Sequence, residues 1–237
     1  MPAHLHISKD PAAVATDFTR YFVELLEGKD HLTVALSGGS TPKRLFKLWA
    51  EQYRDTIDWS KIRFFWGDER CVPPNHEESN YGMTKQLLFN HVYLPEENIH
   101  RVIGEADPTA EAIRYSAEIS DNTEASEGYP VFDLVILGMG SDGHTASIFP
   151  HQMDLLESEK FCAVADHPES GQQRITLTGP VINRAKAVAF LVTGESKQEK
   201  VSAILGREEG ATQFPAAHIM PQSGDLHWFM DEAAYSE

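Results

Sequence analysis

The chain has 237 residues, of which 41% are hydrophobic and 24% charged, as in an ordinary globular protein with a core of its own. Its 20 Lys and Arg against 36 Asp and Glu give a formal net charge of −16, which argues against nucleic acid or an anionic membrane as the main partner. The chain has no long apolar run, and we expect its two cysteines, Cys71 and Cys162, to be reduced thiols of a cytoplasmic protein without a membrane span.

Apolar, strand-like runs alternate with helical patterns along the chain, which favours an α/β fold with a mostly parallel sheet. In chain order we predict a helix at 10–26, with Asp10 as N-cap, a strand at 32–36, a helix at 41–49, a strand at 62–66, a loop at 71–79, a helix at 80–89, a helix at 110–120, a polar surface connection at 121–130, strands at 132–137, 174–177 and 187–192, a helix at 195–205 and a strand at 226–230. No stretch resembles an interdomain linker, so we expect residues 1–237 to form a single domain.

Polar segments follow four of the predicted strands. They are 37–39, 67–70, 138–144 and 194–197. Because the carboxyl ends of parallel strands meet at one edge of a sheet, where open α/β sheets bind ligands, we expect these four segments to line one crevice.

The segment after the first predicted strand has the composition of an anion site. It consists of Ser37, Gly38, Gly39, Ser40 and Thr41. Gly38 and Gly39 let the backbone turn its N–H groups toward a ligand, and the following helix, with Thr41 as predicted N-cap, adds a partial positive charge. The segment lacks the Walker A pattern. The alternative is an ordinary strand-to-helix turn.

Three basic residues are candidates for completing this site. Lys197 lies at the start of a predicted helix, where a cation is unfavourable with the helix dipole, so a functional reason is indicated. Arg174 opens a predicted strand, and the alternative is a surface arginine. Arg70 follows Asp68 and Glu69, and the alternative is a simple ion pair with one of them.

The segment 138–143 matches the G-x-G-x-x-G pattern of dinucleotide sites, and Glu159 lies about 20 residues further on. We reject that interpretation because Pro150 follows Gly143 too closely for the long helix that such a site needs. Asp142 and His144 instead flank one glycine, so their side chains can reach one small volume. A carboxylate beside an imidazole suits a general base that activates water. The alternative is a loop aspartate that caps the backbone and an exposed histidine.

Other histidines give weaker signals. His4 and His6 alternate on a strand edge without nearby Cys, Asp or Glu ligands in the sequence, so we do not expect a metal site there. His218 and His227 are assigned structural roles. We predict no cofactor.

Several segments together resemble the 6-phosphogluconolactonase family. They are LSGGSTPKRLF (36–46), FFWGDERCVPPNHEESNYG (64–82), LGMGSDGHTASIFP (137–150), RITLTGPVINRA (174–185) and VTGESKQEK (192–200). The resemblance implies a Rossmann-like three-layer α/β sandwich shared with glucosamine-6-phosphate deaminases and ribose-5-phosphate isomerases. It also implies hydrolysis of 6-phosphoglucono-δ-lactone, in the oxidative pentose phosphate pathway.

By this resemblance His144 is the base and Asp142 assists it, while the 37–41 turn, Arg70, Arg174 and Lys197 form the phosphate pocket. Asp68 and Asn80 are assigned substrate-facing roles. Backbone N–H groups of 138–143 are candidate donors to the oxyanion. The partner is then a phosphorylated sugar lactone, without a metal, and the protein is a monomer or a homodimer.

Two other functions stay open at this point. A glucosamine-6-phosphate deaminase has a similar Asp-Gly-His loop, but the GDER and HTAS segments of this chain look lactonase-like. A non-catalytic sugar-phosphate sensor has no need of Asp142 and His144 together.

Overall fold

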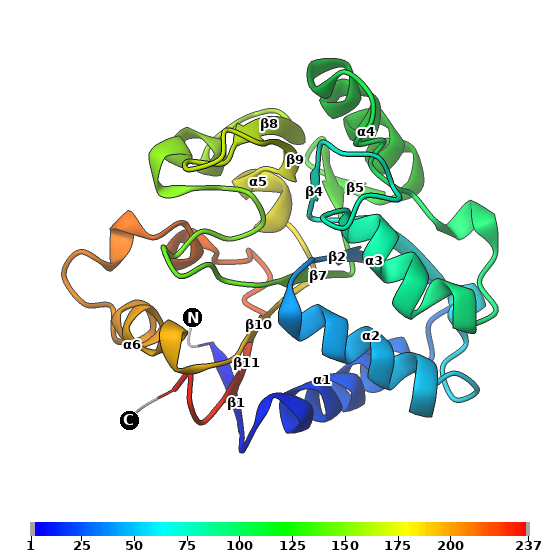
Figure 1. Ribbon diagram of the computed structural model, residues 1–237, viewed down its shortest axis with the longest axis horizontal. Helices are drawn as coiled ribbons and strands as arrows, with labels where there is room; N and C mark the ends of the chain where they lie inside the picture. The colour runs from blue at the N-terminus through cyan, green and yellow to red at the C-terminus, as the bar shows by residue number, and fades with distance from the viewer. Residues whose placement is uncertain (1–2, 236–237) are drawn as a thin grey trace.

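The computed structural model describes residues 3–235, and its centre is a six-stranded sheet in which every neighbouring pair is parallel (Figure 1). The strand order is β1 (His4–Ser8), β11 (Leu226–Asp231), β10 (Ala187–Val192), β7 (Leu134–Leu137), β2 (Leu32–Leu36) and β3 (Ile62–Trp66). The strands β2, β7 and β10 are buried along their whole length. Continuous apolar strands of this kind need cover on both faces of a parallel sheet.

Helices supply that cover, with α1 and α2 on one side of the sheet and α5 and α6 on the other (Figure 1). The helices are α1 (Pro11–Leu26), α2 (Ser40–Gln52), α3 (Asn80–Leu87), α4 (Pro108–Asn122), α5 (Gly179–Ile182) and α6 (Gln198–Gly206). Short 3₁₀ segments lie at Trp59–Lys61, Phe89–His91, Glu96–Asn98, Pro150–Leu156, Glu195–Lys197, Ala211–Gln213 and Pro215–His218. Within residues 3–235, no helix is both long and apolar enough to cross a membrane.

Two small antiparallel sheets complete the described part of the fold. One has the order β4 (Asp68–Arg70), β9 (Gln173–Leu177) and β8 (Cys162–Asp166), and the other pairs β5 (Glu124–Ser126) with β6 (Tyr129–Val131). The predicted strand 174–177 therefore exists, but it lies outside the main sheet.

The predicted mostly parallel α/β fold is confirmed, and β2, β3 and β10 have the predicted bounds. The helix α1 begins as predicted, because the Asp10 carboxylate accepts hydrogen bonds from the N–H groups of Ala12 and Ala13. The predicted polar connection at 121–130 does lie mainly at the surface, but it contains regular structure, since α4 runs to Asn122 and the β5–β6 hairpin follows. The predicted helix 195–205 is divided into a 3₁₀ turn and α6.

The start of α2 differs from the prediction. The helix begins at Ser40 with Gly39 as N-cap, and Thr41 does not cap it. Gly39 has φ of +106°, a backbone conformation that favours glycine, and the N-cap therefore lies two residues earlier than predicted. The Thr41 hydroxyl instead lies 3.0 Å from the hydroxyl of Thr193, which follows β10.

A buried carboxylate joins strands at the amino edge of the main sheet. Asp133, just before β7, accepts hydrogen bonds from the N–H and the hydroxyl of Thr33, both at 2.9 Å. Lys186 and Lys29 lie 3.1 Å and 3.4 Å from its other oxygen. Burial acts to raise the pKa of Asp133, but the Thr33 and Lys186 hydrogen bonds outweigh it and lower the pKa below its ordinary value.

We expect Asp133→Asn to lower the free energy of unfolding at pH 7 by about 3 kcal/mol, because it leaves buried donors without a charged acceptor. The pKa of Asp133 is lower in the folded state than in the unfolded state, so this stabilisation is present above the unfolded pKa and is lost as the pH falls through the folded one. Urea denaturation at pH 7 and at pH 3 measures the difference. Asp55→Asn, at an exposed position, is the control, and equal losses in both variants at pH 7 contradict the prediction.

Candidate active site

A cavity of about 220 Å³ lies at the carboxyl edge of the main sheet, and all four predicted polar segments contribute to it. The predicted residues that line it are Ser37, Gly38, Gly39, Ser40, Thr41, Asp68, Arg70, Asn80, His144, Arg174 and Lys197. Pro42, Gly138, Met139, Gly140, Ala146, Leu191, Val192 and Thr193 also line it. Asp142 is outside this lining, but it contacts His144 directly.

His144 and Asp142 form a hydrogen-bonded dyad. The Asp142 carboxylate lies 2.6 Å from Nδ1 of His144 and also accepts the His144 backbone N–H at 3.1 Å. Partial burial acts to raise the pKa of Asp142, but the hydrogen bond and charge of His144 outweigh it and lower the pKa to about 2. Because Nδ1 is engaged by a permanently charged carboxylate, Nε2 is the ring nitrogen that can act as a base toward a ligand.

The loop around the dyad depends on Gly140. A Cβ atom at this position would overlap the His144 ring and the Asp142 carboxylate, so only glycine leaves room for the pair. The Gly140 N–H donates to the carbonyl of His144 at 2.8 Å, and the Gly143 N–H donates to the carbonyl of Gly140 at 3.1 Å. The N–H groups of Gly140 and Gly143 already donate hydrogen bonds within the loop, so they are removed from the expected oxyanion donors at 138–143.

The segment 138–149 contains no helix, which agrees with the rejection of a dinucleotide site there. Ala146 in the same loop has φ of +48°, a conformation that non-glycine residues seldom adopt. Loop strain of this kind is concentrated at functional sites.

The 37–41 turn presents the amino end of α2 to the cavity without a side-chain cap. Its first backbone N–H groups and the helix dipole therefore favour an anion. Gly38 has a separate role, since a Cβ atom there would overlap the amide of Asn80. The turn and Asn80 can lie against each other only because Gly38 has no side chain.

Arg70 and Arg174 are direct register partners in the β4–β9 pair. Both have a buried Nε atom without a hydrogen-bond partner within residues 3–235. Burial is the main cause that lowers the pKa of Arg174, while the charge of Asp68 opposes it. Two neighbouring guanidinium groups with unused donors are an arrangement that favours a phosphate or carboxylate ligand.

The alternatives for these arginines do not hold. Arg174 is buried, so it is not a surface arginine. Arg70 donates from its side chain to the carbonyl of Glu78 at 2.6 Å, and the ion pairs found within residues 3–235 do not join it to Asp68 or Glu69.

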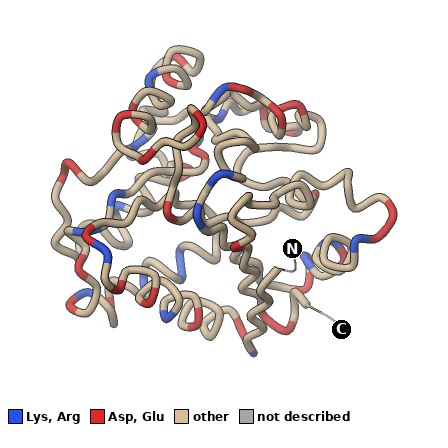
Figure 2. The backbone as a smooth tube through the Cα atoms, turned by 180° about the vertical axis from the view of Figure 1, so that it is seen from behind, with Lys and Arg blue, Asp and Glu red and all other residues tan. Residues whose placement is uncertain are grey.

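Lys197 lies across the cavity in the 3₁₀ turn after β10. Its partial burial lowers the pKa of its ammonium group, and the charge of Asp142 opposes this effect. Acidic residues are spread along the outer helices and loops of the backbone (Figure 2). The three cations therefore give the cavity a local charge opposite in sign to that of the whole chain.

Glu69 does not line the cavity, but it positions a residue that does, and sequence reasoning missed this role. Its buried carboxylate accepts from the backbone N–H groups of Asn80 and Tyr81, both at 2.8 Å, and from the Ser79 hydroxyl at 3.1 Å. Burial raises the pKa of Glu69, and the backbone hydrogen bonds oppose that rise. Glu69 thus fixes the amino end of α3, where Asn80 enters the cavity.

Ser147 was also missed. It donates to the Asp68 carboxylate at 2.7 Å and lies 3.4 Å from a guanidinium nitrogen of Arg174. Asp68 and Arg174 are both far from Ser147 in the sequence, so no local sequence pattern indicates either contact.

The reason given for expecting no metal site at His4, the lack of nearby ligands, does not hold in the folded chain. The sequence places no carboxylate near His4, but the fold brings Asp225 and His227 beside it. Within residues 3–235, this is the group of three His, Cys, Asp or Glu side chains whose ligand atoms are close enough to hold one metal ion.

Comparison with known proteins gives consistent matches over nearly the whole chain. The family profile described as glucosamine-6-phosphate isomerases/6-phosphogluconolactonase matches residues 9–228. The 6-phosphogluconolactonase of Haemophilus influenzae is 47% identical over 202 residues, which cover 85% of each chain. That of Treponema pallidum is 40% identical over 219 residues, covering 92% of this chain and 91% of the relative.

Solved structures agree with these matches. The structure titled as the devB protein is 41% identical with a TM-score of 0.93, covering 98% of each chain. The 6-phosphogluconolactonase of Trypanosoma brucei is 28% identical with a TM-score of 0.88, covering 98% of this chain and 97% of that one.

We expect inorganic phosphate to bind in the cavity, and Arg174→Met to weaken that binding about 10- to 100-fold, because charge-assisted hydrogen bonds are lost. Isothermal titration calorimetry at low salt measures the dissociation constants, and circular dichroism checks the fold of the variant. Arg54→Met is the control, since Arg54 is exposed and lies outside the cavity. Equal affinities for the wild type and Arg174→Met contradict an anion site at this arginine.

Proposed function

The chain belongs to the family of glucosamine-6-phosphate isomerases and 6-phosphogluconolactonases, and on that premise we propose that it hydrolyses 6-phospho-D-glucono-1,5-lactone to 6-phospho-D-gluconate. The observation that carries the proposal is the placement of the His144–Asp142 dyad on the same small cavity as three cations. One end of the cavity then holds the phosphate, and the other activates water at the lactone carbonyl.

In the first step, Nε2 of His144 takes a proton from a water molecule as the water oxygen attacks the carbonyl carbon. Asp142 holds the ring through Nδ1 and stabilises the imidazolium that forms. The carbonyl oxygen becomes an oxyanion, which backbone N–H groups of the 138–143 loop other than those of Gly140 and Gly143 can stabilise.

In the second step, the tetrahedral intermediate collapses and the bond to the ring oxygen breaks. The His144 imidazolium returns its proton to that oxygen, which becomes the hydroxyl group of the open-chain acid. The base is thereby restored and one water molecule has been added across the ester bond. A lactone carbonyl is electrophilic, so this route needs no covalent intermediate on the protein.

The cations and the 37–41 turn act at a distance from the bond that breaks. Binding of the phosphate by Arg70, Arg174, Lys197 and the amino end of α2 orients the carbonyl toward His144. Asp68 and Asn80, on the same cavity wall, are assigned to the sugar hydroxyl groups.

The proposal also covers the organisation of the protein. Residues 1–237 act as one domain in the cytoplasm, as a monomer or a homodimer. The acidic net charge of −16 supports a small-molecule partner over nucleic acid.

We expect His144→Ala to lower kcat by about 10²- to 10⁴-fold with little change in KM, because it removes the base. We expect Lys197→Ala mainly to raise KM, because it removes a contact to the non-reacting phosphate. Initial rates of lactone hydrolysis, corrected for the spontaneous reaction, measure both. Lys160→Ala, at an exposed position, is the control for the second variant. Normal activity of His144→Ala, or ammonia release from glucosamine 6-phosphate by the wild type, contradicts the proposal.

The pH profile tests the dyad separately. With a pKa of about 2, Asp142 stays charged throughout an assay from pH 5 to pH 9. The charged carboxylate holds the ring through Nδ1, and we therefore expect Asp142→Asn to lower kcat across this whole pH range with little change in KM. Rates from pH 5 to pH 9 measure this, with Asp55→Asn as control. A kcat of Asp142→Asn equal to that of the wild type at every pH rules out the assigned role of Asp142.

A further inference from the structure

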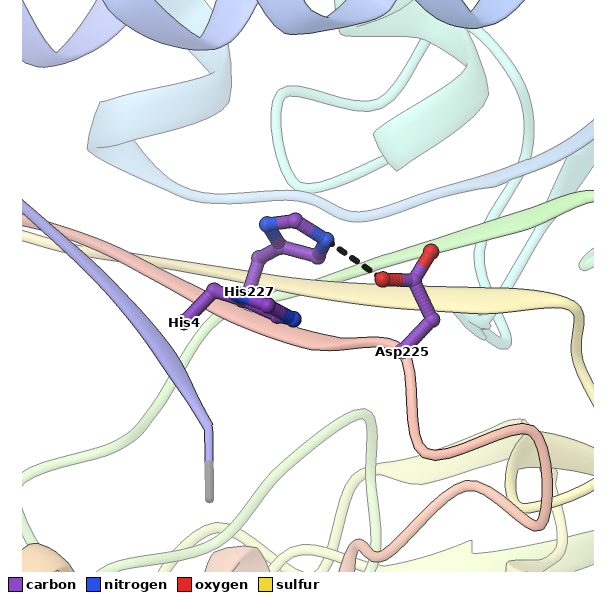
Figure 3. A group of neighbouring side chains, drawn as sticks. All are labelled: His4, Asp225 and His227. Carbon is purple, nitrogen blue, oxygen red and sulfur yellow. Dashed lines mark hydrogen bonds and ion pairs between the residues drawn. The ribbon is translucent and has the colours of Figure 1, made fainter. Parts of the chain in front are cut away.

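A second group of polar side chains, His4, Asp225 and His227, is shown in Figure 3. It lies at the amino edge of the main sheet, and none of its members lines the cavity. His4 opens β1 and is the register partner of His227 in β11. Asp225 precedes His227 by two residues, so both side chains project to the same face. One ligand atom from each of the three residues lies within 4.8 Å of the others.

The three side chains already converge. Nε2 of His227 lies 2.8 Å from a carboxylate oxygen of Asp225, as the dashed line in Figure 3 shows. The rings of His4 and His227 are stacked, with centroids 4.8 Å apart and an interplanar angle of 23°. His227 is buried and His4 is exposed, so the group is open to solvent from the side of His4.

The contact between His6 and His227 is a second observation that supports His227 as a metal ligand. Nε2 of His6 lies 2.9 Å from Nδ1 of His227. A histidine that binds a metal through Nε2 carries its proton on Nδ1 and donates it to a neighbouring acceptor, which fixes the ring orientation. His6 is placed to be that acceptor.

Tyr21 borders the same group. Its ring centroid lies 4.5 Å from that of His227, and its hydroxyl is close enough to Asp225 for an electrostatic interaction. The hydroxyl is buried and has no hydrogen-bond partner within the described residues 3–235. It is therefore an unused donor beside the cluster, available to an oxygen ligand of a bound ion.

We propose that His4, Asp225 and His227 bind a Zn²⁺ ion, with water as the fourth ligand. Two imidazoles and one carboxylate suit zinc, whereas Mg²⁺ and Ca²⁺ prefer oxygen ligands alone. Zinc bonds of 2.0–2.2 Å place tetrahedral ligand atoms about 3.3 Å apart. A small opening of the Asp225–His227 pair and a rotation of the exposed His4 side chain reach that spacing.

The ion would join two strands. His4 belongs to β1, which is at the edge of the main sheet and pairs with β11 alone, while His227 belongs to β11. Zinc binding therefore holds the edge strand against its neighbour and stabilises the folded state by mass action. No residue of this group lines the cavity that contains His144.

Zinc titration of the chelator-treated full chain tests the proposal. We expect the wild type to bind one equivalent of zinc at this site. We expect His4→Ala and Asp225→Asn each to raise the Kd for that zinc ion by more than a hundredfold. At a hundredfold excess of zinc over Kd, Tm should rise by about 5 to 10 °C in the wild type and stay constant in both variants. His31→Ala, at another exposed histidine, should behave as the wild type, and zinc-free His4→Ala should retain full lactone hydrolysis.

His6→Phe separates a metal site from a surface histidine cluster. It keeps an aromatic ring next to Phe229 and removes the acceptor for His227, so we expect zinc affinity to fall about 10- to 100-fold. Equal zinc binding by the wild type, His4→Ala and Asp225→Asn overturns the proposal and places the ion elsewhere, such as at His144. Absence of zinc binding by the wild type also overturns it, and neither result bears on the hydrolysis of the lactone.

Discussion

The parallel alignment of the six central strands is the constraint on which the site depends. Because all six run in one direction, the segments after β2, β3, β7 and β10 meet at one edge, and each contributes to the same cavity. The residues before or at the start of β1 and β11 meet at the opposite edge by the same rule. One topological fact therefore brings together His144 with Lys197 at one edge and His4 with Asp225 at the other.

The cavity concentrates positive charge in an acidic protein. Arg70 and Arg174 lie side by side in the β4–β9 pair, and both leave a buried Nε atom unpaired within the described residues. Such an arrangement is unfavourable for a protein without an anionic ligand, since like charges repel and buried donors lose water. Asp68 offsets part of this cost through its charge. Under the proposed function, the remaining donors bind the substrate phosphate, which would restore the stability that the unpaired groups cost.

Two glycines set the distances in the cavity through close approach. Gly140 admits the His144–Asp142 pair, and Gly38 admits Asn80. In both cases a Cβ atom would occupy the space of a neighbouring side chain, so the proposed catalytic pair and the proposed substrate-facing Asn80 each depend on a glycine. The distance between the Asp142 carboxylate and Nδ1 of His144 is short, at 2.6 Å, and the loop that carries both residues is held closed by its own backbone hydrogen bonds.

The sequence by itself determined the apolar strands, the amphipathic helix after Asp10, and the approximate meeting of the dyad, since Asp142 and His144 are two residues apart and local chemistry suffices. It also indicated which polar segments share an edge, because that follows from strand direction. Only the tertiary structure decided that Arg70 pairs in register with Arg174, that Glu69 holds the start of α3, that Gly39 and not Thr41 caps α2, and that Asp225 and His227 reach His4. These contacts join segments that are far apart in the chain. They are created by strand register and close packing, and neither produces a repeating pattern in the local sequence from which the contact could be predicted.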